Sequence, residues 1–178
     1  MTWESLDWAA LERLRGKFLQ GGAALAGPYW ESPAELANYD FTYGERIGWK
    51  WDQVFRELRL RGWRPRSRTV LDWGCGSGIA ARRVIGWLGA EHFDSLTVWD
   101  HSPTACDFAA DAVQREFPSV RVQQATPGFL AAAGPIGLLL VSHVLNELPP
   151  GALGALRAVA RRADAVLWVE PGTYADSR

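Results

Sequence analysis

The stretch LDWGCGSG combines an acid, Asp72, with glycines at every second position, Gly74, Gly76 and Gly78. An apolar run precedes it and a helical pattern follows it, so the glycines are expected in a turn between a strand and a helix. Such a turn points backbone N–H groups and a helix N-terminus at a ligand. A tight turn that binds nothing is the simpler interpretation of so short a motif taken alone.

The spacing of the glycines argues against two nucleotide-binding loops. The dinucleotide fingerprint G-x-G-x-x-G would need its third glycine at Ile79, one residue after Gly78. A P-loop would need a Gly-Lys-Ser/Thr ending, which the sequence lacks at this point. The pattern therefore favours another ligand, and a nicotinamide dinucleotide is the weaker alternative.

A second acid, Asp100, ends the apolar run LTVWD, 22 residues after Gly78. A carboxylate in this place can accept hydrogen bonds from both hydroxyls of a ribose, as it does in dinucleotide-binding folds. The alternative is that Asp100 caps the following helix. Because Ser102 precedes Pro103 and can take the capping role, we expect Asp100 to bind ribose.

Polar residues also follow the run LLLVS, where Ser142 and His143 are succeeded by Asn146 and Glu147. His143 is the only obvious acid–base candidate, since the pKa of an unperturbed histidine lies near 6.5. The simpler interpretation is that His143 lines the ligand pocket or bonds to Glu147. Its catalytic role is left open.

Alternating strands and helices must position these residues. From residue 69 onward, short and nearly continuous apolar runs alternate with helical patterns, which indicates a parallel sheet covered on both faces. We expect a doubly wound α/β domain over 63–178, after an N-terminal helical extension over 1–62, with its ligand at the carboxyl ends of the strands. The expected strands are 69–73, 96–100, 120–125, 137–142 and 165–170, and the main expected helices are 45–60, 81–89, 103–117 and 150–163.

Composition and charge narrow the class of protein. Of the 178 residues, 48% are hydrophobic and 22% are charged, which is typical of a globular chain. The net charge of -1 gives no overall reason to bind nucleic acid, so any such contact must come from a local patch, and no DNA partner is expected. The most apolar window is interrupted by glycine, proline and histidine, so no membrane helix is expected. The two cysteines, Cys75 and Cys106, support neither a disulfide framework nor a metal site, and we expect a cytoplasmic protein.

LDWGCGSG resembles the first motif of class I S-adenosylmethionine-dependent methyltransferases, in which an acid precedes G-x-G-x-G. The resemblance implies a Rossmann-like domain that binds S-adenosyl-L-methionine. Asp72 would organise the methionine end of this cofactor and Asp100 its ribose, while Gln123, Gln124 or neither would meet the adenine. The cofactor-binding residues expected on this basis are Asp72, Gly74, Cys75, Gly76, Gly78, Asp100, His101, Gln124, Ser142 and His143.

Three segments together give a more specific resemblance. VLDWGCGSG, SHVLNELPP and VLWVEPGTYADSR are similar to a methyltransferase-like family associated with the small ribosomal subunit in mitochondria and bacteria, over roughly residues 38–178. The resemblance implies a protein that acts on or with rRNA or a protein of that subunit. Members carry a cysteine cluster for an iron–sulfur centre after V-E-P-G-T. This sequence has no such cysteines, so no metal is expected.

Three interpretations of function follow. The first is an S-adenosylmethionine-dependent methyltransferase of the small ribosomal subunit. The second is a ribosome-assembly factor that keeps the cofactor pocket without catalysis, and the third and weakest is a nicotinamide-dependent oxidoreductase. No further strand is expected after Glu170, so the sheet would be incomplete beyond its fifth strand. The exposed edge would permit a homodimer.

Two features concern the surface. Trp49 and Trp51 are spaced by two in a predicted helix, so at most one of them faces the core. We expect one core anchor and one surface residue, with a lid or an RNA-stacking surface as the alternative. Arginines concentrate between residues 56 and 68, where a solvated helix face is a simpler interpretation than contact with RNA.

Overall fold

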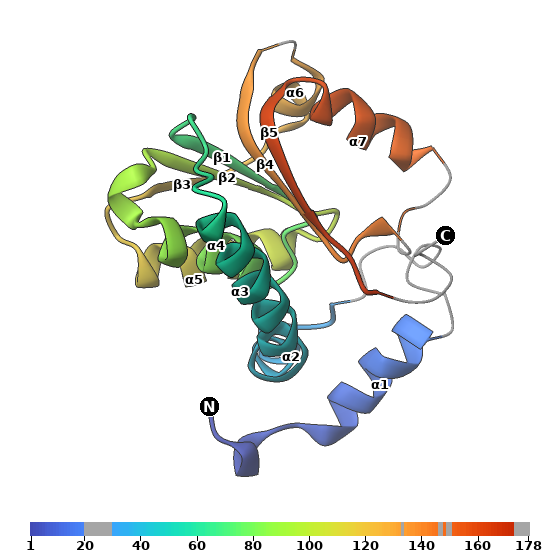
Figure 1. The fold of residues 1–178 in the computed structure, drawn as a ribbon. Helices are drawn as coiled ribbons and strands as arrows, with labels where there is room; N and C mark the ends of the chain where they lie inside the picture. The colour runs from blue at the N-terminus through green and yellow to red at the C-terminus, as the bar shows by residue number, and fades with distance from the viewer. Residues whose placement is uncertain (20–29, 133, 146–147, 149–150, 173–178) are drawn as a thin grey trace.

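The computed structural model describes the chain apart from 20–29, 133, 146–147, 149–150 and 173–178 (Figure 1). The polar pair Asn146 and Glu147 lies outside the described residues. None of the described helices is long and apolar enough to cross a bilayer. The helices are η1 (Trp3–Ser5), α1 (Trp8–Leu19), α2 (Pro33–Tyr39), η2 (Asp40–Gly44), α3 (Glu45–Leu60), α4 (Ile79–Leu88), η3 (Ala90–His92), α5 (Pro103–Glu116), α6 (Pro127–Ala131) and α7 (Ala152–Ala160).

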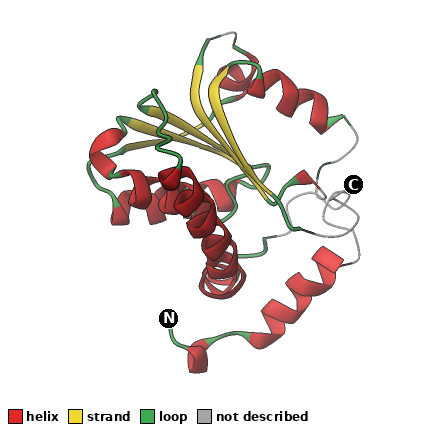
Figure 2. Cartoon of the chain, viewed as in Figure 1, coloured by secondary structure: helices red, strands yellow, loops and turns green. Residues whose placement is uncertain are grey.

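Five strands form one parallel sheet in the order β3-β2-β1-β4-β5. Figure 2 shows the strands in yellow between layers of helices. The predicted doubly wound α/β fold is therefore confirmed. The strands are β1 (Thr69–Trp73), β2 (Ser95–Trp99), β3 (Arg121–Gln124), β4 (Ile136–Ser142) and β5 (Ala163–Val169).

Alternating side chains of the sheet build a core on each face. On one face Val70 and Leu138 pack in a cluster that includes residues of α3, α4 and α5. On the other, Leu71 and Leu139 pack in a cluster with residues of α7 and against α6. Burial on both faces explains why the central strand β4 is apolar along nearly its whole length. It also explains why buried Asp72, in the middle of this sheet, is unusual.

Side-chain caps fix where several helices begin. The Ser32 hydroxyl accepts a hydrogen bond from the Glu35 amide at 3.2 Å, and the Ser102 hydroxyl accepts one from the Ala105 amide at 3.3 Å. The cap at Ser102 was predicted from the sequence. Thr126 caps α6 in the same way.

The predicted helix over 45–60 is α3, and its inner face carries Trp51 and Phe55 into the main core. Trp51 is fully buried whereas Trp49 is 61% exposed, so the expectation of one anchor and one surface residue is confirmed. A π-helical segment, η2, joins α2 to α3 without a break in the helical backbone. Wider π turns of this kind often occur at functional sites. The division of the chain at residue 62 stays a prediction.

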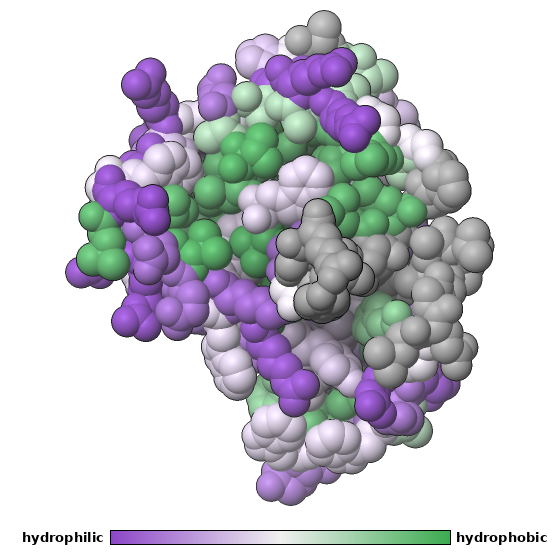
Figure 3. All heavy atoms as spheres, turned by 45° about the vertical axis from the view of Figure 1, so that its right-hand side comes forward, coloured by the Kyte–Doolittle hydropathy of each residue, from purple (hydrophilic) through white to green (hydrophobic). Residues whose placement is uncertain are grey.

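The edge strand β5 leaves apolar surface partly uncovered. Val166 is 39% exposed and Trp168 is 41% exposed. Figure 3, turned to bring the β5 side of the molecule forward, shows apolar side chains gathered over this part of the sheet. An edge strand can pair with another chain, and a homodimer stays a prediction.

Replacing Leu139 tests the importance of the central strand β4. This side chain is fully buried, so Leu139→Ala should lower the free energy of unfolding by about 2–5 kcal/mol. Leu60→Ala removes the same atoms from a residue that is 82% exposed, so it should change the free energy of unfolding by less than about 0.5 kcal/mol. Urea titration followed by circular dichroism measures both. Equal effects would contradict the described burial.

Candidate functional site

The carboxyl ends of β1, β2 and β4 bring the candidate residues together. The loop after β1 is tied to the end of β2, because the Trp99 carbonyl accepts hydrogen bonds from the amides of Gly74 at 2.7 Å and Cys75 at 2.9 Å. The Gly78 amide donates to the Cys75 carbonyl at 2.7 Å and closes the turn into α4. The loop is therefore a defined backbone structure.

The three glycines of this loop adopt positive φ angles, of 76° at Gly74, 50° at Gly76 and 75° at Gly78. Their surroundings differ. A Cβ at Gly74 would lie 2.5 Å from Cγ1 of Val144, and one at Gly78 would lie 3.0 Å from Cβ of Ala109. A Cβ at Gly76 would meet no described atom within 4 Å. Two glycines thus allow close packing within the protein, and Gly76 faces space that a ligand could take.

The Asp100 carboxylate lies beside this open glycine. Its Oδ2 accepts a hydrogen bond from the Gly76 amide at 3.0 Å, and its Oδ1 accepts one from the Ser102 amide at 2.9 Å. The side chain is only 7% exposed, and burial raises its pKa against the opposing effect of these two amides. Each carboxylate oxygen keeps a further lone pair, so Asp100 can still accept hydroxyl groups. His101 is exposed, with its Nδ1 3.2 Å from Oδ1 of Asp100.

Asp72 lies within the sheet, at the end of β1. It is fully buried, and neither of its carboxylate oxygens receives a hydrogen bond from a described residue. Burial raises its pKa to about 7 from an ordinary 3.8; the Ala81 backbone opposes the change, and the charge of Asp100 adds to it. A buried polar group without a partner is costly. Asp72 is therefore ready to accept a donor or a positive charge from a ligand.

The two cysteines lie under the same loop. Cys75 is buried, which is the main reason that its pKa is raised, and it contacts Cys106. The Asp100 amide donates to the Cys106 sulfur at 3.1 Å. Both cysteines are free thiols. They fix the base of the loop, so any contact of Cys75 with a ligand has to use its backbone.

A chain of hydrogen bonds connects α3 to the end of β4. Nζ of Lys50 lies 2.8 Å from Nε2 of His143, and Nδ1 of His143 lies 3.3 Å from Oγ of Ser142. Oγ of Ser142 also accepts a hydrogen bond from Nε1 of Trp51 at 3.0 Å. Burial first, and the Lys50 charge second, lower the pKa of His143 to about 4.

This low pKa decides the direction of the hydrogen bonds. His143 is neutral at pH 7, so the Lys50 ammonium donates to its Nε2 and its Nδ1–H donates to Ser142. The Ser142 hydroxyl then receives two hydrogen bonds and its own proton is available to another acceptor. His143 also has a positive φ of 57°, uncommon for a residue with a side chain.

Glu170 holds the turn that follows β4. Its Oε1 accepts hydrogen bonds from the amides of Val144 at 3.2 Å and Leu145 at 3.3 Å, and from Nε1 of Trp168 at 2.7 Å. Val144 in turn lies against Gly74. The contribution of Glu170 and of Lys50 was missed in the sequence, because each acts on residues far away along the chain.

The structure places Gln124 at the end of β3, where its side-chain amide donates to Oδ1 of Asp107 on α5 at 2.6 Å. Gln123 donates to the Thr97 hydroxyl at 3.0 Å. Both glutamines are exposed and belong to the same edge of the sheet as Asp100. A contact of Gln124 with adenine stays a prediction. For this contact, the side-chain amide of Gln124 would have to bond to adenine and Asp107 together, or break its hydrogen bond to Asp107.

The segment η2 closes one side of the site. The Asp40 carboxylate pairs with Arg82 of α4, and a Cβ at Gly44 would lie 3.5 Å from Oγ of Ser77 in the glycine loop. The ring of Tyr39, at the end of α2, lies 5.8 Å from the ring of Tyr43 in η2. The N-terminal part of the chain therefore contacts the glycine loop directly.

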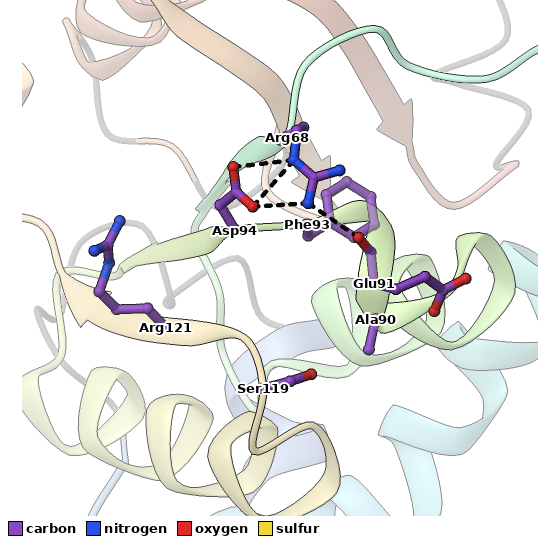
Figure 4. A pocket seen from close by; sticks show the side chains of 7 residues that line it. All are labelled: Arg68, Ala90, Glu91, Phe93, Asp94, Ser119 and Arg121. Atoms are coloured by element: carbon purple, nitrogen blue, oxygen red, sulfur yellow. Dashed lines mark hydrogen bonds and ion pairs between the residues drawn. The ribbon is translucent and has the colours of Figure 1, made fainter.

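A hollow lies at the opposite edge of the sheet from the glycine loop, beside the start of β2 (Figure 4). There the Arg68 guanidinium donates to both carboxylate oxygens of Asp94 and to the Glu91 carbonyl. The charges of Arg68 and Asp94 offset each other, and Glu91 and Arg121 add one charge of each sign. The lining of this hollow includes no buried acid and no glycine, so the end with the glycine loop is the stronger candidate. Among the described residues there is no cluster of acids, histidines and cysteines suited to a metal ion.

The fold is similar to that of several solved structures. The mitomycin 7-O-methyltransferase MmcR matches with a TM-score of 0.55 and 17% identity, covering 90% of this chain and 49% of its own. The plantazolicin methyltransferase BpumL, solved with SAH, matches with a TM-score of 0.52 and 17% identity, covering 90% and 62%. A Pyrococcus horikoshii protein provisionally assigned as an RNA methyltransferase matches with a TM-score of 0.52 and 10% identity, covering 72% and 63%. The fold is that of class I methyltransferases.

The sequence is similar to curated tRNA U34 carboxymethyltransferases. That of Shewanella halifaxensis is 33% identical over 93 residues, which is 52% of this chain and 26% of the relative. That of Shewanella pealeana is 34% identical over 84 residues, which is 47% of this chain and 23% of the relative. The chain spans about a quarter of the length of these relatives. No family model matches the sequence.

The buried carboxyl group of Asp72 predicts a pH dependence of stability. Its raised pKa means that the folded chain binds the proton more tightly than the unfolded chain does, so its contribution to stability is lost as pH rises from about 4 to about 7. Asp72→Asn should abolish this loss and stabilise the ligand-free chain at pH 7.5 by up to about 4 kcal/mol. Urea titrations at pH 4 and pH 7.5 measure it. If Asp72→Asn is less stable than the wild type at pH 7.5, the buried charge of Asp72 is stabilised by other groups of the protein and the prediction is wrong.

Proposed function

We propose that the chain binds S-adenosyl-L-methionine and acts as a methyltransferase on or with the small ribosomal subunit. The observation that supports this most is the open backbone at Gly76 between two buried acids. Asp72 has no partner among the described residues, and Asp100 keeps free lone pairs. The cofactor carries a positive sulfonium and an ammonium group, so two carboxylates beside an open glycine suit it.

Each part of the site has a role in this proposal. Asp72 accepts hydrogen bonds from the ammonium end, directly or through water, and its charged form is then favoured. Gly76 lets the cofactor lie on the backbone, and Asp100 accepts hydrogen bonds from the ribose hydroxyls. When bound, the cofactor supplies a methyl group activated by the sulfonium. The protein contributes orientation and exclusion of water.

The end of β4 faces the acceptor in this proposal. The Ser142 hydroxyl has a proton to donate, and the turn at His143 sets its direction. Nε2 of His143 is already bonded to Lys50, so taking a proton from the acceptor would require that contact to break. We therefore infer that Ser142 and His143 position the acceptor, and that a removable proton leaves through water.

The engaged histidine also supports a second candidate function. A ribosome-assembly factor needs the cofactor pocket to stabilise its fold and needs no free base. The Lys50–His143 contact at 2.8 Å fits such a protein as well as it fits an enzyme with little need for proton transfer. RNA as the partner is supported by the names of the tRNA-directed relatives and by the resemblance to the family of the small ribosomal subunit.

Replacing one glycine at a time tests cofactor binding. Gly76→Ala places a methyl group where the cofactor is proposed to lie, so the dissociation constant for S-adenosylhomocysteine should rise at least about tenfold. Gly62→Ala is the matched control, because Gly62 also has a positive φ, of 64°, and open space at its Cβ. Isothermal titration calorimetry compares the two. If both variants bind like the wild type, or if the wild type binds NAD instead, the proposed site is wrong.

A transfer assay separates the two candidate functions. Tritiated S-adenosylmethionine and purified small ribosomal subunits should give labelled rRNA or protein with the wild-type chain. Asp100→Asn should reduce the labelling by at least about tenfold, because the amide donates where a ribose hydroxyl must donate. If the wild-type chain binds the cofactor but transfers no label, the assembly factor is favoured.

A further inference from the structure

The outer face of α3 carries several basic side chains and one exposed aromatic side chain, Trp49. Its inner face is packed in the core through Trp51 and Phe55, so the opposite face is turned to solvent. At 1.5 Å per residue the face extends about 20 Å. Its exposed residues are Arg46, Trp49, Lys50, Gln53, Arg56, Glu57 and Leu60.

The positive charge continues past the end of α3. Arg59, Arg61, Arg64 and Arg66 are all exposed on the last turn and on the linker to β1. Arg61 pairs with Glu57 at 3.9 Å. The guanidinium groups of Arg59, Arg64 and Arg66 form no hydrogen bond or ion pair with the described residues. The chain has a net charge of only -1, so this surface is a local concentration of positive charge.

The acids nearest to this surface, apart from Glu57 on the face itself, are held against α4. Glu45 and Asp52 on α3 both pair with Arg83 of α4, at 2.7 and 3.8 Å. Asp52 also accepts a hydrogen bond from Nε1 of Trp87 at 2.9 Å. Arg83 offsets one of these two negative charges, and both carboxylates lie on the α4 side of the helix.

This surface begins at the candidate site. Lys50 on α3 reaches His143 at the end of β4, and Trp49 beside it is 61% exposed. From there the face leads towards Arg64 and Arg66, near the amino end of β1 at Thr69. A protein surface that binds single-stranded nucleic acid combines positive groups that contact phosphates with an aromatic ring that stacks on a base. This surface has arginines at one end and Trp49 near the candidate site.

We propose that the outer face of α3 and the 61–66 linker bind the backbone of single-stranded RNA and direct it to the end of β4. Arg59, Arg64 and Arg66 contact phosphates, and Trp49 stacks on a base next to the methyl acceptor. The proposal deepens the proposed function, because it identifies the surface that holds its RNA.

The composition of the surface favours RNA over an anionic membrane. From residue 53 to residue 68 all the basic residues are arginines, whose planar guanidinium groups bind phosphates in pairs and stack on bases. A helix that inserts into a membrane surface needs an apolar face free for lipid. The apolar face of α3 is occupied by the core, and Leu60 is its one large apolar residue with 82% exposure.

Salt-dependent binding tests the phosphate contacts. The probe is a fluorescein-labelled single-stranded 12-mer RNA, titrated with the full chain at several KCl concentrations and followed by anisotropy. The triple variant Arg59→Gln, Arg64→Gln, Arg66→Gln should weaken binding at least about tenfold. It should also reduce the slope of log K against log salt by about 2, because each phosphate that an arginine neutralises contributes about 0.7 to that slope. The control Arg115→Gln, Arg157→Gln, Arg161→Gln removes three exposed arginines elsewhere and should leave the slope unchanged.

Trp49→Ala tests the stacking contact. It should weaken RNA binding by roughly 5- to 100-fold with an unchanged salt slope, whereas Trp8→Ala, which removes a ring of equal exposure from α1, should have no effect. Equal weakening by the two triple variants would show that net charge alone acts. Tighter binding to phosphatidylserine vesicles than to RNA would assign the surface to membranes. Both outcomes overturn the proposal.

The proposal and the proposed function can fail separately. RNA binding is measured without cofactor, and cofactor binding is measured without RNA. If the chain binds RNA through α3 but does not bind S-adenosylhomocysteine, the proposed function is wrong and the proposed RNA-binding surface still holds. If it binds S-adenosylhomocysteine but the arginine and tryptophan variants bind RNA like the wild type, the surface is wrong and the cofactor site is retained.

Discussion

The pairing of the Asp100 carboxylate with two backbone amides is the interaction on which the candidate site depends. By accepting from Gly76 and Ser102, it joins the glycine loop after β1 to the start of α5 after β2. The Trp99 carbonyl strengthens the same junction by accepting from the loop. A carboxylate in this place organises the protein and still has lone pairs for a ligand. The Asp100 carboxylate therefore both holds the glycine loop in place and can accept hydrogen bonds from a ligand.

The site stores unfavourable free energy that a ligand could release. Asp72 is a carboxyl group buried in the sheet without a hydrogen-bond partner among the described residues. His143 has a positive φ and a pKa lowered by burial and by Lys50. The apolar core around β1 and β4 compensates for these costs, since Leu71, Leu139 and their neighbours are almost fully buried. Such local costs often occur at functional sites.

The sequence predicted the parts of the site that depend on local pattern. The glycine spacing and the acid that ends LTVWD required only a strand, a turn and a helix, and all three form close to where they were expected. The capping role of Ser102 followed from its place before Pro103. Lys50 and Glu170 could not be found in this way. Their partners at the end of β4 lie 93 and 25 or 26 residues away along the chain, and only the folded sheet brings them together.

The arginines show how structure changes the interpretation of a charge pattern. In the sequence, a run of arginines on a helix is most simply a solvated face. The structure adds that Arg83 holds the neighbouring acids Glu45 and Asp52 on the side of α4, and that the outer face reaches His143 through Lys50. These contacts link α3 to the end of β4, which local periodicity does not reveal.

The most direct measurement is a crystal structure of the chain with S-adenosylhomocysteine. The account predicts that the ligand lies on the backbone at Gly76, with both ribose hydroxyls within about 3 Å of the Asp100 carboxylate and its ammonium group directed at Asp72. A ligand bound elsewhere, such as the hollow beside Arg68, or a Gly76 backbone with no ligand at saturating concentration, would contradict it.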